Sequence, residues 1–272
     1  MGIEEGKVEL GRARPPAARR ALVSGGSRGV GYAIAAALAG AGWRVALVGR
    51  QRAGVDAALR AMRARGADVV GVCGDISSLA GARHVYDDAL GALGGPPAVL
   101  VHAAGIFGPI EPIADVSAEA WSAVLDTNLL GAFYLTRLAL AAMLGARWGR
   151  VIYVSSKAAV SAPGSLASAY AVSKVALNRL AAELAEEVEG FGVSANSIHP
   201  GEVRTAKWED IQQKTAREPS AHGLRGWAER VERTGGDPPE LAASMVLWLI
   251  DHPEVSGRFL LPEDWRCLCS VT

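Results

Sequence analysis

The sequence predicts an α/β protein in which a doubly wound parallel sheet of about seven strands carries helices on both faces. Short apolar runs alternate along the chain with longer segments rich in alanine and leucine, which is the pattern of repeated β-α-β units. The apolar runs are continuous, as in Val151–Val154, and continuous runs are typical of strands buried on both faces. The length of 272 residues suits a single domain of this class.

The elements are assigned in order along the chain. The expected strands are short, apolar and rich in β-branched residues, and they are Ala21–Ser24, Val45–Gly49, Val69–Cys73, Val99–His102, Val151–Ser155, Val193–Ile198 and Arg258–Leu261. The expected helices are longer and rich in alanine and leucine, and they are Gly31–Ala41, Val55–Arg65, Leu79–Leu93, Ala118–Leu144, Ser168–Glu189 and Glu240–Asp251.

One segment, residues 201–239, breaks the alternation. It is polar, and a long insertion in a compact domain is usually a lid or a disordered loop. The amphipathic stretches Ala206–Arg217 and His222–Thr234 favour a lid made of two short helices. Its expected flexible points are Gly223, Gly226, Gly235 and Gly236. A rigid insertion that serves subunit contacts is the competing interpretation.

The charge balance excludes some classes of partner. Lys plus Arg equal Asp plus Glu at 28 each, which argues against binding nucleic acid or an anionic membrane. No apolar run is expected to reach the length of a membrane span. The most basic stretch, with Arg12, Arg14, Arg19 and Arg20, lies in a Pro-containing N-terminal segment, and residues 1–18 are expected to be a flexible tail ahead of one folded domain over residues 19–272.

The cysteines and the N-terminal residues bear on metal binding and compartment. Of the three cysteines, Cys267 and Cys269 are separated by one residue, and no His or Cys cluster lies near them in sequence. No metal site is therefore expected, and free thiols suit a reducing cytoplasm. The first twenty residues are acidic at several positions and lack an apolar core, so a cytoplasmic location is expected.

A glycine-rich corner follows the first expected strand. It reads Ser24-Gly25-Gly26-Ser27-Arg28-Gly29-Val30-Gly31 and leads into an alanine-rich helix. Glycines let the backbone turn tightly and approach a pyrophosphate, whose charge is favoured at a helix N-terminus. A glycine turn alone is a weak signal, but its place at the first strand-to-helix corner predicts a dinucleotide site.

The end of the second expected strand discriminates between NAD and NADP. An acid there bonds the ribose 2′-hydroxyl in NAD sites and repels a 2′-phosphate. Here the strand ends in Gly49 and Arg50 with no acid, and an arginine can form a bidentate pair with a phosphate. Arg50 and Arg28 together predict NADP(H), although two surface arginines in an Arg-rich chain would look the same.

Four polar residues are candidates for catalysis. Tyr170 and Lys174 are four residues apart, which places both side chains on one helical face. Ser156 follows the strand Val151–Ser155 directly. Asn128 is a polar residue among the apolar residues of an expected helix, and a polar side chain at such a position calls for a structural or functional explanation. The spacing of Tyr170 and Lys174 alone means little, because it occurs by chance in many helices.

In this order and on these elements, Asn128, Ser156, Tyr170 and Lys174 resemble the catalytic tetrad of the short-chain dehydrogenase/reductase family. The resemblance runs from about Ala21 to Leu261 and implies a Rossmann fold. It implies cofactor-binding roles for Gly25, Ser27, Arg28, Gly29, Val30, Arg50, Asp75, Ile76, Ala104, Gly105, Asn128, Tyr170, Lys174, Pro200, Gly201, Val203 and Thr205.

The resemblance implies an NADPH-dependent oxidoreductase that reduces a ketone or aldehyde, or runs the reverse oxidation. Tyr170 is the expected general acid/base, with a pKa drawn toward neutral by Lys174 and the nicotinamide charge. Ser156 is expected to hold the substrate oxygen. Lys174 is expected to bond the nicotinamide ribose, and Asn128 to fix a water that relays protons to Lys174.

Two departures from the family pattern stand out. His102 replaces the first Asn of the family's motif after the fourth strand, and a structural role is expected for it. The C-terminus lacks the usual Val-Asp-Gly-Gly ending, which makes the usual tetramer less secure. A homodimer or homotetramer is expected, with helices Ala118–Leu144 and Ser168–Glu189 as the candidate contact, unless their apolar faces are core.

Other functions remain open at this point. The runner-up is a redox-sensing regulator that binds NADP(H) without turnover, which would have no need of Tyr170. A nucleotide-sugar epimerase or dehydratase is a third, but these extended relatives usually carry a larger C-terminal substrate domain. Fold alone does not choose among them.

Overall fold

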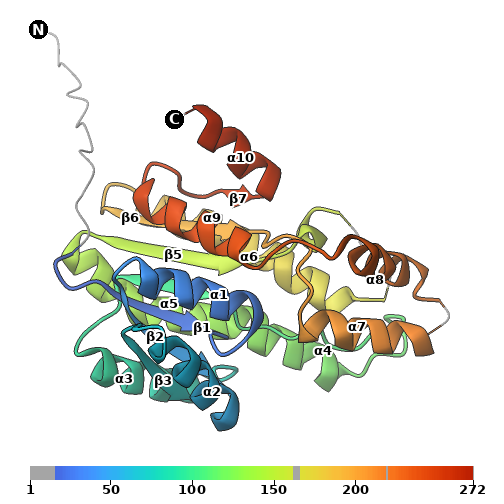
Figure 1. The fold of residues 1–272 in the computed structure, drawn as a ribbon. Helices are drawn as coiled ribbons and strands as arrows, with labels where there is room; N and C mark the ends of the chain where they lie inside the picture. Colours follow the sequence, from blue (N-terminus) through green and yellow to red (C-terminus); the bar gives the residue numbers. More distant parts are fainter. Residues whose placement is uncertain (1–15, 162–165, 219, 272) are drawn as a thin grey trace, which may run out of the picture.

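A computed structural model describes residues 16–161, 166–218 and 220–271. Most of the expected N-terminal tail, residues 1–15, lies outside the described residues. A parallel sheet of seven strands in the order β3-β2-β1-β4-β5-β6-β7 forms the centre of the molecule (Figure 1). This is the doubly wound α/β architecture predicted from the sequence.

All seven expected strands are present, with bounds shifted by two residues at most. They are β1 (Arg20–Ser24), β2 (Arg44–Gly49), β3 (Val69–Cys73), β4 (Val99–His102), β5 (Gly149–Val154), β6 (Val193–Ile198) and β7 (Phe259–Leu260). Every neighbouring pair is parallel, so the carboxyl ends of all the strands meet at one edge. Chain connections between parallel strands run through helices, which explains the regular alternation.

The helices cover both faces of the sheet. They are α1 (Gly29–Gly40), α2 (Arg52–Arg63), α3 (Leu79–Leu93), α4 (Ala118–Leu125), α5 (Gly131–Ala146), α6 (Ser168–Glu187), α7 (Ala206–Arg217), α8 (His222–Thr234), α9 (Glu240–Asp251) and α10 (Pro262–Val271). Side chains of α1, α2 and α9 form the core on one face, and those of α3, α5 and α6 form the core on the other. The core helices are rich in small alanines, which allow close packing against the strands.

The structure differs from the sequence prediction at two helices. The expected helix Ala118–Leu144 is interrupted by a π-helical turn, η1 (Asp126–Leu130), between α4 and α5. The helix α10 was not expected, because Cys267, Cys269 and Ser270 are poor helix formers. Trp265 of α10 packs against the core on the α1 side, and this tertiary contact explains the helix.

The expectation that no apolar run reaches the length of a membrane span was wrong. The continuous helical run Ala118–Ala146 is long and apolar enough to cross a membrane, by length and composition alone. Its inner side, including Leu135, Ala139 and Met143, packs into the sheet core, and 33% of its most apolar window is buried. Packing against the sheet therefore accounts for part of its apolar character.

The order of the strands reverses between β1 and β4, where Ser24 and His102 lie opposite each other. Beyond this pair the polypeptide leaves β1 and β4 toward opposite faces of the sheet. Ligands of open α/β sheets bind in the crevice that forms at such a point. Ser24 Oγ and His102 Nδ1 are 2.8 Å apart, and both residues are fully buried. This buried contact supports the structural role expected for His102.

A buried arginine, Arg150 of β5, connects the sheet to its neighbours. Its Nε donates to the Ile250 carbonyl at 3.1 Å, and its Nη1 donates to the Gly192 carbonyl at 3.1 Å. The guanidinium also lies 4.2 Å from the centroid of the Trp148 ring. Burial lowers the pKa of Arg150 to about 10, so the side chain remains charged at neutral pH.

We expect Arg150→Leu to destabilise the protein by about 3 kcal/mol, because two or more charge-assisted hydrogen bonds are lost and buried carbonyls are left unpaired. Thermal unfolding is the measurement, and Arg179→Leu is the matched control. Arg179 lies on the surface of α6 in an exposed pair with Glu183, which contributes about 1 kcal/mol at most. Equal melting temperatures of the two variants would contradict this role of Arg150.

Candidate active site

A cavity of about 1090 Å³ opens at the carboxyl edge of the sheet and runs from the glycine-rich corner to the space beneath α7 and α8. Figure 1 shows these two helices together at that end of the molecule. Every expected cofactor residue except Asn128 lines this cavity. This volume slightly exceeds the range of about 300–1,000 Å³ that is typical of small-molecule sites.

The glycine-rich corner forms one end of the cavity and requires glycine at specific positions. Gly25 has φ +70°, and a Cβ there would lie 2.6 Å from the Ala104 nitrogen. A Cβ at Gly31 would lie 2.3 Å from the Gly25 carbonyl oxygen. The backbone therefore folds back on itself, and α1 begins with its N-terminus at the cavity, where a pyrophosphate is favoured.

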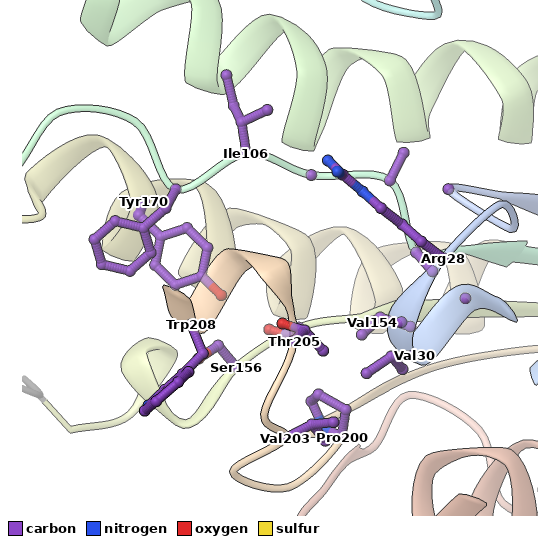
Figure 2. Close-up of a pocket in the computed structure, with 18 of the residues that line it drawn as sticks. Arg28, Val30, Ile106, Val154, Ser156, Tyr170, Pro200, Val203, Thr205 and Trp208 are labelled. Carbon is purple, nitrogen blue, oxygen red and sulfur yellow. The ribbon is translucent and has the colours of Figure 1, made fainter. Parts of the chain in front are cut away.

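Arg28 and Arg50 both line the cavity at this end, as does Asp75 beyond β3. Arg28 precedes the first residue of α1, and Arg50 directly follows β2. Figure 2 shows the Arg28 side chain extended beside the cavity. In the part of the chain that the structure describes, neither arginine forms an ion pair with a carboxylate. Their charges are therefore not neutralised by an acidic side chain.

Tyr170 and Ser156 meet in the middle of the cavity. Ser156 follows β5, Tyr170 lies in the first turn of α6, and a side-chain hydrogen bond joins them. Figure 2 shows the Tyr170 ring directing its hydroxyl toward Ser156. The Tyr170 side chain is 9% exposed, so the hydroxyl pair faces the cavity from an otherwise buried position. Such a pair can bind one oxygen of a ligand and pass a proton to it.

Lys174 lies one helical turn after Tyr170 in α6. Its Nζ donates to the Val154 carbonyl at 2.8 Å and lies 5.6 Å from the centroid of the Tyr170 ring. Lys174 is almost fully buried yet contributes to the cavity wall. An ammonium held in this way places positive charge beneath the cavity, beside the phenol.

Asn128 lies in the π-helical turn η1 and is fully buried. Its Oδ1 accepts from the Ile106 amide at 2.8 Å, and its Nδ2 donates to the Ile106 carbonyl and to Ser173 Oγ, both at 3.0 Å. A Cβ at Gly105 would lie 3.1 Å from Asn128 Oδ1 and 3.7 Å from Lys174 Nζ. Asn128 therefore fixes the backbone at Ile106 behind the cavity wall, and π turns are frequent at functional sites.

The sequence expectation of a Tyr170 pKa drawn toward neutral includes the charge of a bound nicotinamide, whereas the structure describes the phenol in the protein alone. Burial raises the pKa above its ordinary value of 10.0, and the hydrogen bond with Ser156 opposes this shift only in part. The physical reason is the enclosure of the ring, which disfavours a phenolate. In the protein alone, Tyr170 is therefore a protonated group at neutral pH, and it can donate a proton.

Helices α7 and α8 match the expected bounds, and Trp208 of α7 donates its indole N–H to the Ala228 carbonyl at 3.2 Å. The ends of the insertion are joined by a bridge between Val203 and Asp237. Arg230 of α8 pairs with Glu202 at 2.8 Å. These contacts hold the two helices over the cavity in this structure. Pro219, which the sequence places between them, lies outside the described residues.

The expected flexible points of the insertion need a correction. Gly223 and Gly226 lie inside α8, so they are not hinges between elements. Gly235 ends α8 with φ +79°, and Gly236 also has positive φ, as a tight turn requires. At Gly236 a Cβ would lie 2.4 Å from the Glu202 carbonyl oxygen, so this glycine also permits a close backbone approach.

Sequence reasoning did not identify several residues of the site. The Phe107 ring lies 4.6 Å from the Tyr170 ring, centroid to centroid, and Lys157 and His199 line the cavity beside Ser156. The Lys157 amide donates to His199 Nδ1 at 3.3 Å, and burial lowers the pKa of His199, with Lys157 adding to the effect. The sequence offers one indication of these three residues, which is that each lies within two positions of an expected site residue.

A doubly wound sheet with a cavity at its carboxyl edge is typical of nucleotide-binding α/β proteins, and similar proteins identify the family. The family model described as short chain dehydrogenase matches residues 19–216. A short chain dehydrogenase of Pseudocercospora fijiensis is 34% identical over 69% of this chain and 60% of its own length. L-fucose dehydrogenase of Mus musculus is 32% identical over 88% of this chain and 85% of its own length.

A solved structure shows the same fold. A variant of actinorhodin polyketide ketoreductase with NADPH has a TM-score of 0.80 and 27% identity, covering 90% of this chain and 95% of that one. The chain belongs to the short-chain dehydrogenase/reductase family, as its resemblance indicated. It is therefore an oxidoreductase that acts on CH–OH or C=O groups with a nicotinamide cofactor.

Proposed function

We propose that the protein is an NADP(H)-dependent carbonyl reductase that interconverts a ketone or aldehyde and the alcohol, with Tyr170 as general acid/base. The observation that carries this proposal is the hydrogen-bonded pair of Tyr170 and Ser156 in the cavity that begins at the glycine-rich corner. The small-molecule substrate would lie with its oxygen between these two hydroxyls.

The residues present fit a nicotinamide dinucleotide. At Gly25 and Gly31 the neighbouring backbone lies so close that a Cβ would collide with it, and α1 begins at this corner. Arg28 and Arg50 provide positive charge for a 2′-phosphate, and β2 ends without an acid that would repel one. The remaining expected cofactor residues also line the cavity, except Asn128, whose part in our proposal is to position Ile106.

The chain's own groups would complete the chemistry. A bound reduced nicotinamide supplies the hydride that adds to the carbonyl carbon. Tyr170 donates its phenolic proton to the carbonyl oxygen, and Ser156 donates a hydrogen bond that stabilises the charge on that oxygen. Lys174 holds positive charge near the phenolate that remains and favours it. In the reverse direction Tyr170 accepts the proton.

Isotope transfer tests the proposed function. NADPH deuterated at the transferable position of C4 is incubated with the protein and a ketone, and the product is examined by mass spectrometry. We expect the alcohol to gain one deuterium at its carbinol carbon. Loss of NADPH absorbance without labelled alcohol would contradict hydride transfer to a carbonyl.

The binding-only regulator has no support from the site or from the relatives.

The raised pKa of Tyr170 predicts the pH dependence. Reduction needs the protonated phenol, which persists up to a pKa above 10.0, so kcat/KM for ketone reduction should be flat from pH 7 to about 9. Oxidation needs the phenolate, so its rate should rise across the same range. Initial rates in both directions provide the measurement. A fall in reduction by half between pH 7 and 8 would instead indicate a pKa near neutral.

We also propose that residues 201–239 act as a lid that becomes better ordered over bound substrate. The described part of α7 and α8 contacts the rest of the chain at few polar points, among them the bond from Lys214 to the Gly108 carbonyl at 3.1 Å. Hydrogen exchange should be slower here when NADPH and a substrate analogue are both present than with NADPH alone. Equal exchange in both samples would favour the rigid insertion.

The helices α5 and α6 are the proposed subunit contact. Phe133 of α5 and Val172 and Val175 of α6 are large apolar side chains that remain exposed. Apolar area of this kind is typical of surfaces that another protein covers. We therefore propose that these helices form the contact of a homodimer or homotetramer. The cytoplasmic location expected from the sequence also remains part of the proposal.

A further inference from the structure

The wall of the cavity beside Tyr170 is apolar. Phe107, Ile211 and Leu224 line the cavity and are each at most 6% exposed. They belong to one cluster that joins the loop after β4, the start of α6 and the inner faces of α7 and α8. Tyr170 is part of the same cluster. A ligand whose oxygen reaches the Tyr170 hydroxyl therefore has carbon surfaces around the rest of its body.

Two tryptophans extend this apolar wall. Trp208 and Trp227 both line the cavity, from α7 and α8. The indole N–H of Trp208 is engaged by the Ala228 carbonyl, so Trp208 has no further polar group to offer a ligand. The Arg204 guanidinium lies 4.7 Å from the centroid of the Trp208 ring. Flat aromatic surfaces favour flat or cyclic apolar ligands, which stack well against them.

Several polar side chains of α7 and α8 already bond to other protein groups. Lys214 donates to Asp210 and to the Gly108 carbonyl, and Arg225 donates to the carbonyls of Thr215 and Glu218. Gln212 donates to Glu232. None of these donors lines the cavity. The residues of α7 and α8 that do line it are Trp208, Ile211, Gly223, Leu224, Trp227 and Arg230, and Arg230 is paired with Glu202. A ligand with many hydroxyls would therefore give up bonds to water and find few partners on the α7 and α8 side of the cavity.

The polar side chains that line the cavity in this region lie along its edge, on the segments that follow β5 and β6, at the start of α6 and at Arg230 of α8; they are Ser156, Lys157, Ser161, Tyr170, His199, Glu202, Arg204, Thr205 and Arg230. Ser156 and Tyr170 bind the reacting oxygen in the proposed function, and Glu202 and Arg230 occupy the wall as an ion pair at 2.8 Å. From this arrangement, and resting on the proposed function, we infer that the substrate is a bulky, largely apolar cyclic or aromatic carbonyl compound. The wall of Phe107, Trp208 and Trp227 is what selects it against polyhydroxylated compounds of similar size.

Competition between substrate classes tests the inference with the wild-type protein. Reduction of 1-tetralone, a bicyclic aromatic ketone, is compared with reduction of butanone, using NADPH. Oxidation of the tetralone's alcohol is compared with oxidation of sorbitol and glucose, using NADP⁺. We expect kcat/KM to favour the bicyclic compound at least a hundredfold in both comparisons. Turnover of the polyols or of butanone with equal or higher kcat/KM would overturn this inference and leave the proposed function standing. Absence of turnover with every compound, despite NADPH binding, would overturn both.

A matched pair of tryptophan variants tests the wall itself. Trp227→Ala removes a partly buried indole from the cavity, and Trp248→Ala removes a partly buried indole from α9, outside it. We expect Trp227→Ala to lower the ratio of kcat/KM for 1-tetralone over butanone at least tenfold, mainly through KM. The ratio for Trp248→Ala should stay at the wild-type value. Melting temperatures and NADPH affinities are measured for both variants. An unchanged ratio in a folded, NADPH-binding Trp227→Ala protein would overturn the role of the wall.

Discussion

Replacing Tyr170 with Phe is expected to lower kcat at least a hundredfold while leaving the affinity for NADPH almost unchanged. The phenol is the proton donor in the proposed mechanism, and general acid catalysis is worth about 10²- to 10⁴-fold. The nucleotide would be held mainly at the glycine-rich corner and by Arg28, Arg50 and Lys174, which the substitution leaves in place. Stopped-flow turnover with a ketone and fluorescence titration with NADPH measure the two quantities.

The control for this variant is Tyr134→Phe in α5. Tyr134 is partly buried against the core and does not line the cavity, so its hydroxyl should not affect turnover. A Tyr170→Phe protein that keeps a tenth of wild-type kcat would mean that another group supplies the proton. Loss of NADPH binding would instead indicate that Tyr170 supports the nucleotide site.

Arg50→Asp is expected to shift cofactor preference from NADPH toward NADH. The change replaces attraction to the 2′-phosphate with repulsion and introduces an acceptor for a ribose 2′-hydroxyl. Loss of one charge-assisted hydrogen bond, about 1.5–3 kcal/mol, corresponds to at least a tenfold weaker NADPH affinity. Calorimetric titration with both nucleotides provides the affinities.

Arg52→Asp is the matched control for this charge reversal. Arg52 begins α2 only two residues away, and it is exposed and does not line the cavity. Arg52→Asp changes the net charge by the same amount as Arg50→Asp, so any general electrostatic effect on nucleotide affinity appears in both variants. Affinities for NADPH and NADH that stay the same in Arg50→Asp would remove Arg50 from the nucleotide site.

The sheet and most helices were predictable because local patterns and burial agree along this chain. Strands buried on both faces are mostly apolar, and residues 21–23 of β1 and 151–154 of β5 show this plainly in the sequence. The bounds of α7 and α8 were predicted because both helices are amphipathic. The turn η1 and the helix α10 depend on tertiary contacts, through Asn128 and Trp265, that periodicity does not record.

The candidate site was predictable where residue type and position are linked. Tyr170, Lys174 and Ser156 were identified because, together with Asn128, they resemble the family's catalytic tetrad in their order and in the elements that carry them, whereas the spacing of Tyr170 and Lys174 alone means little. The environment of Tyr170 was not predictable, since its raised pKa comes from enclosure by residues such as Phe107, which the sequence separates widely. The partners of Asn128 were likewise hidden, because Ile106 and Ser173 come from different elements.

The most direct test of the central claim is the rate of NADPH oxidation across a panel of ketones and aldehydes, read at the absorbance of the reduced nicotinamide. Wild-type protein and Tyr170→Phe are measured side by side, so background oxidation is subtracted. We expect at least one carbonyl compound to be reduced by the wild type at a hundred times the rate of the variant. Tight NADPH binding with no difference between the two proteins on any compound would contradict a carbonyl reductase that uses Tyr170.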